Sequence, residues 1–566
     1  MKGNLTMKTL KHKMLFSILI LAAIFTQSAF AQYFLKSYDF PPYMSRTDVG
    51  RSIEKTSTSA TGSGWSIAGF SNSTPSAGDF DWMYLKLNST GSVICSTLLG
   101  FPLGDSCFSH VKFNDASKRN VLAGFYRSLN GKEKASWSML DSNCNHLFSK
   151  QILDSLRHQY RQVVVNPSNS FTNAGFIQYF MGGMTPNKIL VTQYNSAGVL
   201  TWGFKYITPG PSTDEAYTLC YQSVDGSYAV AGRTNYPSGA GFNVFVLKLS
   251  PAGFPIWNKI YKFPGLAANS NAYRIIAMPD GGYVIAGWTN AFDPASNDIW
   301  IFRINAAGIP MWSFTYGLPG VDEESFSIVY NLTDNSLALS GHTNISGSED
   351  ILLGKLNAAG GAPLWFTKYT NPAGYDRGYD IENELAPSGY SLTGQVFVSS
   401  SASLDAFLMR ADALGKVTPG CLDTLMLPPR PSQLMLDSMM FNELPVQDVQ
   451  IQPQVIHPSV AVRNLCVLTG TGQNQNYIPK EFSLKQNYPN PFNPSTKIEF
   501  SLPVDGKISI KIFDASGKEI AVLINEHKNK GNYSLEFNAS NLPSGVYFYK
   551  LQAEGFSDTK KMVLIK

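Results

Sequence analysis

Charged residues are scarce in this 566-residue chain, since Asp, Glu, Lys and Arg together make up 15% of it. The formal net charge is +4, but four of the lysines precede Met14 in a stretch without acidic residues, so the rest of the chain is nearly neutral. A neutral chain offers no electrostatic attraction to phosphate backbones or anionic lipid. We therefore expect neither nucleic acid nor an anionic membrane as a partner.

Long apolar runs are absent after the N-terminus. There, basic residues precede the apolar run 14–25, and Ala29-Phe30-Ala31 follows as a small-x-small cleavage site before Gln32. This pattern is typical of a secretory signal peptide, and the run is short for a bilayer span. We expect residues 1–31 to be removed, which leaves an exported mature chain without a transmembrane span. An uncleaved anchor is the alternative.

Cysteine is also scarce: the six residues are too few for a disulfide scaffold, and none belongs to a C-x-x-C pair. The seven histidines are scattered, which argues against a zinc site, and we expect no metal and no cofactor. Cys421 and Cys466 flank a Pro- and Gln-rich stretch. In an oxidising compartment we expect these two to pair, with two unrelated thiols as the alternative.

Catalytic motifs are missing as well: the chain has no P-loop, no H-E-x-x-H and no G-x-S-x-G near a credible partner set. Glycoside hydrolysis would need only two suitably placed carboxylates. Asp322, Glu323, Glu324 and Asp376 are candidates for these, although acidic residues near surface loops are common. We predict no catalytic residues and favour a protein that is not an enzyme.

Glycine, proline and aromatic residues are abundant, with 47 Gly, 32 Pro and 13% aromatics, as is typical of a turn-rich all-β chain. A repeat of roughly 50 to 60 residues is marked by a glycine that follows a small residue. The seven glycines are Gly69, Gly124, Gly183, Gly232, Gly287, Gly341 and Gly394.

Each repeat is predicted to contain four short strands, which in one unit are 273–278, 283–286, 299–304 and 310–316. Asn305-Ala-Ala-Gly308 predicts a turn closed by a left-handed residue. Glycine recurs at that position in the other units, with Cys144 as the exception; these glycines are Gly91, Gly198, Gly253, Gly360 and Gly415. Four strands at this period favour a β-propeller blade over a linear solenoid.

The two ends of the repeat region complement each other. The seventh unit stops after Gly415 without a fourth strand, and Tyr33–Tyr38 at the start of the mature chain resembles Trp365–Tyr369. We predict that the N-terminal strand becomes the outer strand of the seventh unit, since closing the ring removes an exposed edge. Residues 32–417 are thus predicted to form a seven-bladed β-propeller.

One column of the repeat varies in chemistry on a constant framework, as expected for a ligand face. It is the residue directly after each repeat glycine, where the chain enters the loop between the second and third strands. Packing between blades is the alternative explanation. The residues are Phe70, Phe125, Met184, Arg233, Trp288, His342 and Gln395.

The chain changes character after the repeats. Residues 418–476 are predicted to be a Pro- and Gln-rich linker, whereas residues 477–566 contain alternating strands separated by polar turns. The strands are expected at 497–502, 507–514, 533–538, 545–551 and 559–565. This pattern predicts a small immunoglobulin-like β-sandwich.

Three motifs of this last domain resemble the C-terminal sorting domain of the type IX secretion system of Bacteroidetes-like bacteria. They are Tyr488-Pro-Asn-Pro-Phe-Asn-Pro-Ser-Thr496, Leu542-Pro-Ser-Gly-Val-Tyr-Phe-Tyr-Lys550 and Thr559-Lys-Lys-Met-Val-Leu-Ile-Lys566. The resemblance implies the secretion machinery as a partner, passage through the periplasm and across the outer membrane, and then release or attachment at the surface. The repeats also look like propeller repeats often found upstream of such domains.

The sequence thus predicts a surface or secreted propeller that acts as a non-catalytic binding or scaffold module. Its ligand would be an extracellular polysaccharide or protein. An extracellular glycan hydrolase or lyase on the same scaffold is the alternative.

Overall fold

The structure is a computed structural model and describes most of the chain after residue 33. The described residues are 34–39, 47–56, 64–72, 80–100, 103–237, 241–263, 268–369, 374–385, 388–398, 403–417, 423–425, 427, 429–431, 434–437, 439, 442–451, 454–456, 461–464, 482–487, 490–553 and 555–565. The expected signal peptide and the expected Cys421–Cys466 pair lie outside them. No helix among the described residues is long and apolar enough to cross a membrane. The chain divides into two compact units, 1–467 and 468–566.

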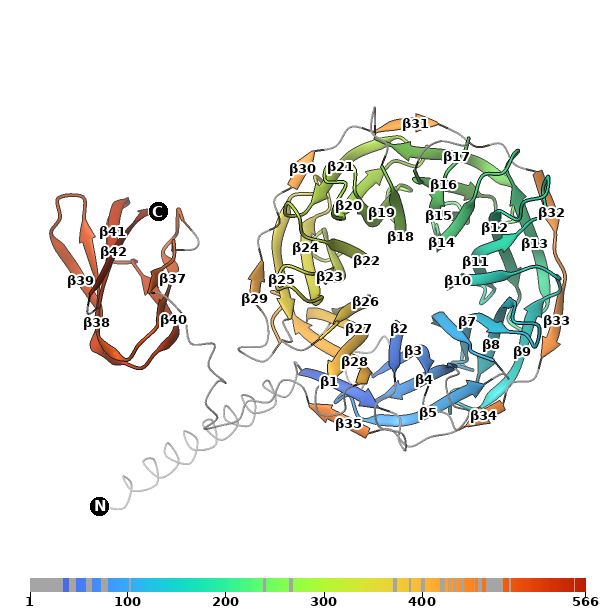
Figure 1. The fold of residues 1–566 in the computed structure, drawn as a ribbon, viewed down its shortest axis with the longest axis horizontal. Helices are drawn as coiled ribbons and strands as arrows, with labels where there is room; N and C mark the ends of the chain where they lie inside the picture. Colours follow the sequence, from blue (N-terminus) through green and yellow to red (C-terminus); the bar gives the residue numbers. More distant parts are fainter. Residues whose placement is uncertain are drawn as a thin grey trace, which may run out of the picture. The chain divides into compact units, whose positions relative to one another are not determined.

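In the first unit, seven five-stranded antiparallel sheets follow one another around a ring, with the first strand of each nearest the centre (Figure 1). This is an all-β, propeller-like arrangement. The first sheet contains β2 (Asp48–Lys55), β3 (Trp65–Ser71), β4 (Asp81–Leu87), β5 (Val93–Gly100) and β34 (Gln454–Ile456). The second contains β6 (Ser106–Lys112), β7 (Asn120–Arg127), β8 (Glu133–Leu140), β9 (His146–Ile152) and β33 (Asp448–Ile451). The third contains β10 (His158–Val165), β11 (Phe171–Gln178), β12 (Asn187–Tyr194), β13 (Leu200–Ile207) and β32 (Asn442–Pro445).

The remaining sheets continue the same order. The fourth contains β14 (Asp214–Tyr221), β15 (Tyr228–Thr234), β16 (Asn243–Leu249), β17 (Pro255–Lys262) and β31 (Met435–Asp437). The fifth contains β18 (Ser270–Ala277), β19 (Tyr283–Thr289), β20 (Asp298–Ile304), β21 (Pro310–Tyr316) and β30 (Pro429–Pro431). The sixth contains β22 (Glu323–Asn331), β23 (Ser336–Thr343), β24 (Asp350–Asn357), β25 (Pro363–Tyr369) and β29 (Asp423–Leu425). The seventh contains β26 (Arg377–Leu385), β27 (Ser388–Val398), β28 (Ser403–Asp412), β1 (Phe34–Asp39) and β35 (Ala461–Asn464).

The glycine that marks each repeat lies opposite a bulge in the first strand. In the fifth sheet the register shifts between Ala272 and Arg274, so Tyr273 has no partner on β19, and Gly287 pairs with Ala272. A Cβ atom at Gly287 would lie 1.9 Å from the carbonyl oxygen of Asn271. Only glycine therefore lets the second strand approach the bulge this closely.

The same arrangement corrects the alignment of the third repeat. There the bulge pairs with Gly175, whose Cβ would lie 1.9 Å from the carbonyl oxygen of Gln159. Gly183, the glycine expected from the sequence, lies in the loop between β11 and β12, with no atom within 4 Å of the position its Cβ would take. The third repeat carries two small-Gly pairs, Ala174-Gly175 and Gly182-Gly183, and only contact with the bulge distinguishes them.

A second repeated contact joins neighbouring sheets near their outer edges. Gly308 closes the turn between β20 and β21 with a φ of +77°, and Asn305 Oδ1 accepts hydrogen bonds from two backbone amides of that turn. The indole of Trp257, from the preceding sheet, lies against Gly308 at 3.1 Å from the position of a Cβ atom. Tyr261 then donates a hydrogen bond of 2.9 Å to the Gly308 carbonyl. In the sixth sheet the left-handed residue is Gly361 rather than the expected Gly360, because that turn is one residue longer.

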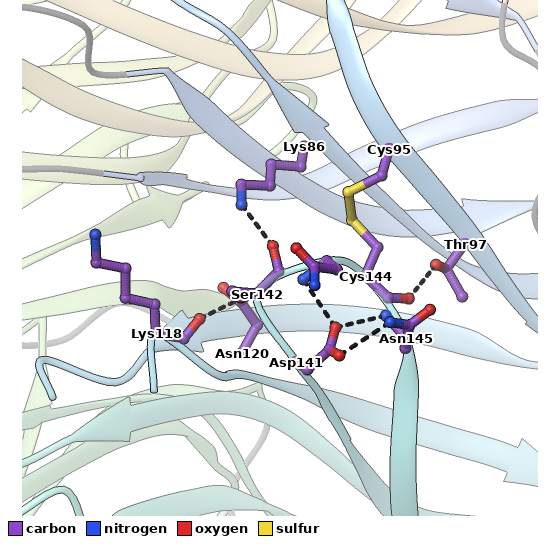
Figure 2. Close-up of a disulfide and its surroundings, with 10 residues drawn as sticks. Lys86, Cys95, Thr97, Lys118, Asn120, Asp141, Ser142, Cys144 and Asn145 are labelled. Atoms are coloured by element: carbon purple, nitrogen blue, oxygen red, sulfur yellow. Dashed lines mark hydrogen bonds between the residues drawn. A yellow bond between two sulfur atoms is a disulfide. The ribbon is translucent and has the colours of Figure 1, made fainter. Parts of the chain in front are cut away.

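Between the first and second sheets a disulfide replaces this tryptophan–glycine contact (Figure 2). Cys95 pairs with Lys86 just as Trp257 pairs with Lys248, and Cys144 occupies the turn position with a φ of +67°. The Cys95–Cys144 bond spans 49 residues, and Thr97 Oγ1 donates a 2.6 Å hydrogen bond to the Cys144 carbonyl. The spacing of the cysteines in the sequence does not predict this pairing. Cys107 and Cys220 are buried free thiols.

The described residues between 423 and 464 correct the prediction of a linker over 418–476. They run around the outside of the ring in the reverse order of the sheets, and β29 to β35 each add a fifth strand to one sheet (Figure 1). We call this segment the belt. Each belt strand pairs antiparallel with the fourth strand of its sheet, which would otherwise present an unpaired edge. Leu427, Met439 and Val446 of the belt are buried among the side chains of the sheets.

The N-terminal strand and the end of the belt meet in the seventh sheet. β1 pairs antiparallel with β28 over Phe34–Tyr38, and β35 pairs with the other side of β1. β1 is thus the fourth strand rather than the outermost, which corrects the expectation for this sheet. β1 is therefore held by strand pairing along both of its edges.

Hydrogen bonds also join the first strands to one another around the axis. The residue after each bulge is polar in all seven sheets, and we call these residues the polar ring: Ser52, Ser109, Gln162, Thr218, Arg274, Ser327 and Asp380. Gln162 Oε1 accepts from the Leu219 amide, and Thr218 Oγ1 accepts from the Ile275 amide, each at 3.0 Å. Asp380 Oδ2 accepts from the Ile53 amide across the junction of the seventh and first sheets at 3.0 Å. These bonds satisfy backbone groups that no neighbouring strand can reach.

His110 is held beside the polar ring in its neutral form. It is 1% exposed, and its Nδ1 and Nε2 atoms lie 3.0 Å and 2.8 Å from the hydroxyls of Ser52 and Ser66. Burial lowers the pKa of His110 to about 3. The folded protein therefore binds a proton at this site much less readily than the unfolded chain does.

The second unit consists of two antiparallel sheets around one apolar core. One contains β36 (Ser483–Leu484), β37 (Ser495–Leu502) and β40 (Gly531–Asn538); the other contains β38 (Gly506–Asp514), β39 (Glu519–Lys528), β41 (Gly545–Ala553) and β42 (Phe556–Leu564). Ile498, Ile510 and Tyr549 are completely buried between the sheets. The sequence did not predict β39, because most of its residues are partly or fully exposed and give no clear alternation.

The disulfide can be tested by exchanging it for the contact used elsewhere in the ring. Cys95→Ser should lower the free energy of unfolding by about 2–4 kcal/mol, because the unfolded chain loses a cross-link. The double change Cys95→Trp and Cys144→Gly should recover part of this loss. Denaturant unfolding measures both values. Under reducing conditions wild type and Cys95→Ser should have the same free energy of unfolding. Equal values in the absence of reductant would contradict the Cys95–Cys144 disulfide.

His110 predicts a loss of stability in acid. An unfolded histidine has a pKa of about 6.5, so as the pH falls below that value the unfolded chain takes up a proton that folded His110 does not accept. Between about pH 7.5 and about pH 5, wild type should lose about 2 kcal/mol more than His110→Gln. Urea unfolding across this range measures the difference. Parallel pH profiles for the two proteins would show that folded His110 titrates normally.

Candidate functional site

The residue left unpaired by each bulge faces a cavity on the axis of the ring. The cavity has a volume of about 310 Å³, and all seven sheets contribute to its lining. We call these seven residues the axial ring: Arg51, Phe108, Arg161, Tyr217, Tyr273, Phe326 and Tyr379. A bulge re-aims one side chain without displacing its strand, which places one such residue from each sheet around the cavity.

Neighbouring members of the axial ring contact one another around the full circle. Tyr273 and Phe326 have ring centroids 5.2 Å apart, and Phe326 and Tyr379 have centroids 4.9 Å apart. The Arg51 guanidinium lies 3.8 Å from the centroid of Tyr379. On the other side, Phe108 lies between Arg51 at 5.9 Å and Arg161 at 4.2 Å. These aromatic and cation–π contacts hold the side chains in place before any ligand arrives.

The residues predicted to form the ligand face lie one layer behind the axial ring. Six of the seven contact the bulged residue of their own sheet and do not line the cavity: Phe70, Phe125, Arg233, Trp288, His342 and Gln395. His342, for example, stacks on Phe326 with centroids 5.5 Å apart. Met184 does not belong to this layer. Phe176 takes its place, 5.4 Å from Arg161, because the third repeat aligns on Gly175.

Two of the four arginines that line the cavity have carboxylate partners. Arg377 forms a bidentate ion pair with Glu349, and Arg274 lies 3.7 Å from Asp380. Arg51 and Arg161 have no carboxylate within 4 Å among the described residues. The Nε atom of each is buried without a hydrogen-bond partner there. Burial lowers the pKa of Arg161 and the nearby Arg51 charge lowers it further, whereas the charges of Glu215 and Glu133 act in the opposite direction.

A second cavity, of about 400 Å³, lies beyond the polar ring along the same axis. Five residues of the polar ring line both cavities: Ser52, Ser109, Gln162, Arg274 and Asp380. The second cavity is otherwise lined by Glu54, His110 and mostly apolar residues of the first strands. Burial, together with the charge of Asp380, raises the pKa of Glu54 to about 7.

The acidic residues considered as glycosidase candidates lie elsewhere. Glu323 and Asp376 are 0% exposed, which corrects the view of these residues as surface acids. Burial raises the pKa of Glu323 to about 8 and that of Glu324 to about 7. None of the four candidates lines either axial cavity. Among the described residues, no group of three or more His, Cys, Asp or Glu side chains could hold a metal ion.

In the second unit the three sequence motifs come together in space. Asn490 Oδ1 accepts a 2.8 Å hydrogen bond from the Val563 amide, and the Phe492 amide donates one of 2.9 Å to the Val563 carbonyl. Tyr549 of the middle motif donates its hydroxyl proton to the Lys485 carbonyl at 2.7 Å. The first motif is therefore anchored on the terminal strand β42, which itself pairs with β41.

Comparison with known proteins finds a family match only for this second unit. Residues 486–566 match the family described as secretion system C-terminal sorting domain. None of the curated proteins matches the chain. Among solved structures, Sqt1 from Chaetomium thermophilum is 12% identical, with a TM-score of 0.34 over 69% of this chain and 86% of that one.

PorZ, an essential bacterial surface component of the type-IX secretion system of Porphyromonas gingivalis, is 9% identical, with a TM-score of 0.24 over 94% of this chain and all of that one. At these scores neither structure carries an argument about this chain. The family match does support a conclusion, because a sorting domain is the part of a protein that the secretion machinery recognises. Residues 486–566 are a secretion system C-terminal sorting domain, which sends this protein across the outer membrane to the cell surface or the extracellular space.

Proposed function

We propose that this protein is a seven-bladed β-propeller followed by an immunoglobulin-like sorting sandwich, exported after loss of residues 1–31. At the cell surface or in the medium it acts as a non-catalytic binding module, and its ligand occupies the axial cavity. The observation that carries this proposal is the lining of that cavity by one bulged side chain from each of seven sheets. Aromatic walls with a few placed polar groups are typical of ligand sites.

The chemistry of the first cavity favours binding over catalysis. Asp380 is the one carboxylate among its described lining residues. It accepts hydrogen bonds from the Ile53 amide at 3.0 Å and the Ser327 hydroxyl at 2.7 Å, and it faces Arg274. Glycoside hydrolysis needs two carboxyl groups on either side of the scissile bond. With the Ile53 amide, the Ser327 hydroxyl and Arg274 as its partners, the Asp380 carboxylate is suited to holding neighbouring residues in place.

The second cavity supports the alternative of a glycan hydrolase or lyase. Glu54 has a pKa raised to about 7 and shares this cavity with Asp380. A carboxyl group whose pKa is raised by burial, close to a second carboxyl group, is a recurring feature of acid–base catalysis. In such an enzyme, Glu54 would be the proton donor.

A combined binding and turnover assay distinguishes the two functions. The chain from Gln32 to Lys566 is titrated with a panel of extracellular polysaccharides, and the same samples are analysed for shortened products. We expect saturable binding without products, and a loss of affinity of roughly 10-fold or more in Tyr273→Ala, which removes an aromatic wall. Phe254→Ala is the matched control, since Phe254 is 57% exposed on a hairpin away from both cavities.

Product formation that disappears in Glu54→Gln would overturn the non-catalytic proposal in favour of the alternative. Binding that Tyr273→Ala leaves unchanged would contradict the axial cavity as the ligand site.

A further inference from the structure

The two halves of the axial cavity differ in chemistry. Tyr217, Tyr273, Phe326 and Tyr379, from the fourth to seventh sheets, form an aromatic half, which also contains the ion-paired side chains of Arg274, Arg377 and Asp380. The first three sheets contribute Ser52, whose hydroxyl donates to the His110 carbonyl, and a second group that consists of Arg51, Phe108, Ser109, Arg161 and Gln162. We call this second group the donor half, because its polar groups offer protons to a ligand.

Each polar side chain of the donor half retains a proton that no described residue accepts. Ser109 Oγ accepts from the Val163 amide at 3.3 Å, which leaves its own hydroxyl proton available. Gln162 Oε1 accepts from Thr218 and from the Leu219 amide, which leaves its NH₂ group available. Arg51 and Arg161 make cation–π contacts, but neither forms an ion pair with a described residue. Unpaired guanidinium groups in a partly buried cavity are costly unless an anion neutralises them.

We infer that the axial cavity binds the carboxylate-bearing sugar of an acidic extracellular polysaccharide, with the carboxylate on Arg51 and Arg161. This inference rests on the proposed binding function and names its ligand class. Guanidinium groups match a carboxylate through paired, charge-assisted hydrogen bonds. The hydroxyl and ring oxygens of the sugar accept from Ser109 and Gln162, and its apolar C–H face packs on the aromatic half.

The size of the cavity limits how much of the polysaccharide enters. A volume of about 310 Å³ is at the lower end of the range for ligand pockets, roughly 300–1,000 Å³. The cavity therefore accommodates a chain end or a single side-branch residue rather than a long internal segment. A peptide would offer carboxylates at its C-terminus and on Asp and Glu side chains, together with amide protons that find no acceptor in the donor half.

The test is calorimetric titration of the chain 32–566 with galacturonate, its trimer and the methyl esters of both. The esters keep the shape of the sugar and remove the charge. We expect the acids to bind and the esters to bind roughly 10- to 100-fold more weakly, which corresponds to the loss of a charge-assisted hydrogen bond. Arg161→Gln and Arg51→Gln should each lose a similar factor for the acids, and Arg161→Lys should recover part of it.

Arg119→Gln is the matched control, because Arg119 also lies over an aromatic ring, 4.9 Å from Phe113, but lines neither cavity. It should bind the acids as wild type does. Far-ultraviolet circular dichroism and melting curves show that each variant is folded. Equal affinity for acids and esters, or wild-type affinity in both arginine variants, overturns the inference.

Three further outcomes separate the inference from the proposed function. Neutral polysaccharides that bind in a Tyr273-dependent and arginine-independent way would refute the acidic ligand and leave the binding function standing. Tight binding of a peptide with a free C-terminus, lost on its amidation, would replace the sugar with a protein ligand. Competition by sulfate at equal concentration would show that the site recognises anions in general and refute the carboxylate sugar.

Discussion

The bulge in the first strand of each sheet is the constraint on which the rest of the ring depends. It leaves one residue without a partner on the second strand and brings the two backbones so close that a Cβ atom on the facing residue would overlap a carbonyl oxygen, as at Gly287. That glycine is therefore required by sterics. The same bulge turns the unpaired residue, Tyr273 in this sheet, toward the axis and places the following polar residue in the polar ring. One backbone irregularity, repeated seven times, thus produces both the wall of the cavity and the hydrogen bonds that join the first strands.

Three sets of contacts, at different distances from the axis, cover the edges and faces of the sheets. At the axis, hydrogen bonds of the polar ring link strands that share no sheet, such as Asp380 to the Ile53 amide. Between the sheets, a large fourth-strand side chain packs on a turn glycine of the next sheet, as Trp257 does on Gly308. At the periphery, the belt pairs with the fourth strand of every sheet. Each device removes exposed backbone or apolar surface that an isolated four-stranded unit would present.

The Cys95–Cys144 bond shows how one position in this framework can change its chemistry without changing its geometry. The disulfide joins the same two backbone positions that tryptophan and glycine occupy elsewhere. A covalent bond replaces an aromatic contact. In both cases the carbonyl of the turn residue accepts a hydrogen bond, at Cys144 from Thr97 and at Gly308 from Tyr261. The export implied by the sorting domain takes the chain through compartments where such a bond forms and persists.

Local sequence determined a large part of this protein. The turns, the alternating strands and six of the seven repeat glycines follow from local sequence, so the repeats, most strand positions and the complementary chain ends can be predicted from them, as can the sorting motifs. The residue after each repeat glycine could be located from the sequence, apart from Met184, but the sequence did not show that these residues lie one layer behind the cavity. The tertiary structure alone decided which first-strand residue faces the axis, since a bulge depends on the approach of another strand. It also decided the belt, whose short strands have no pattern of their own and form only where the ring offers them an edge.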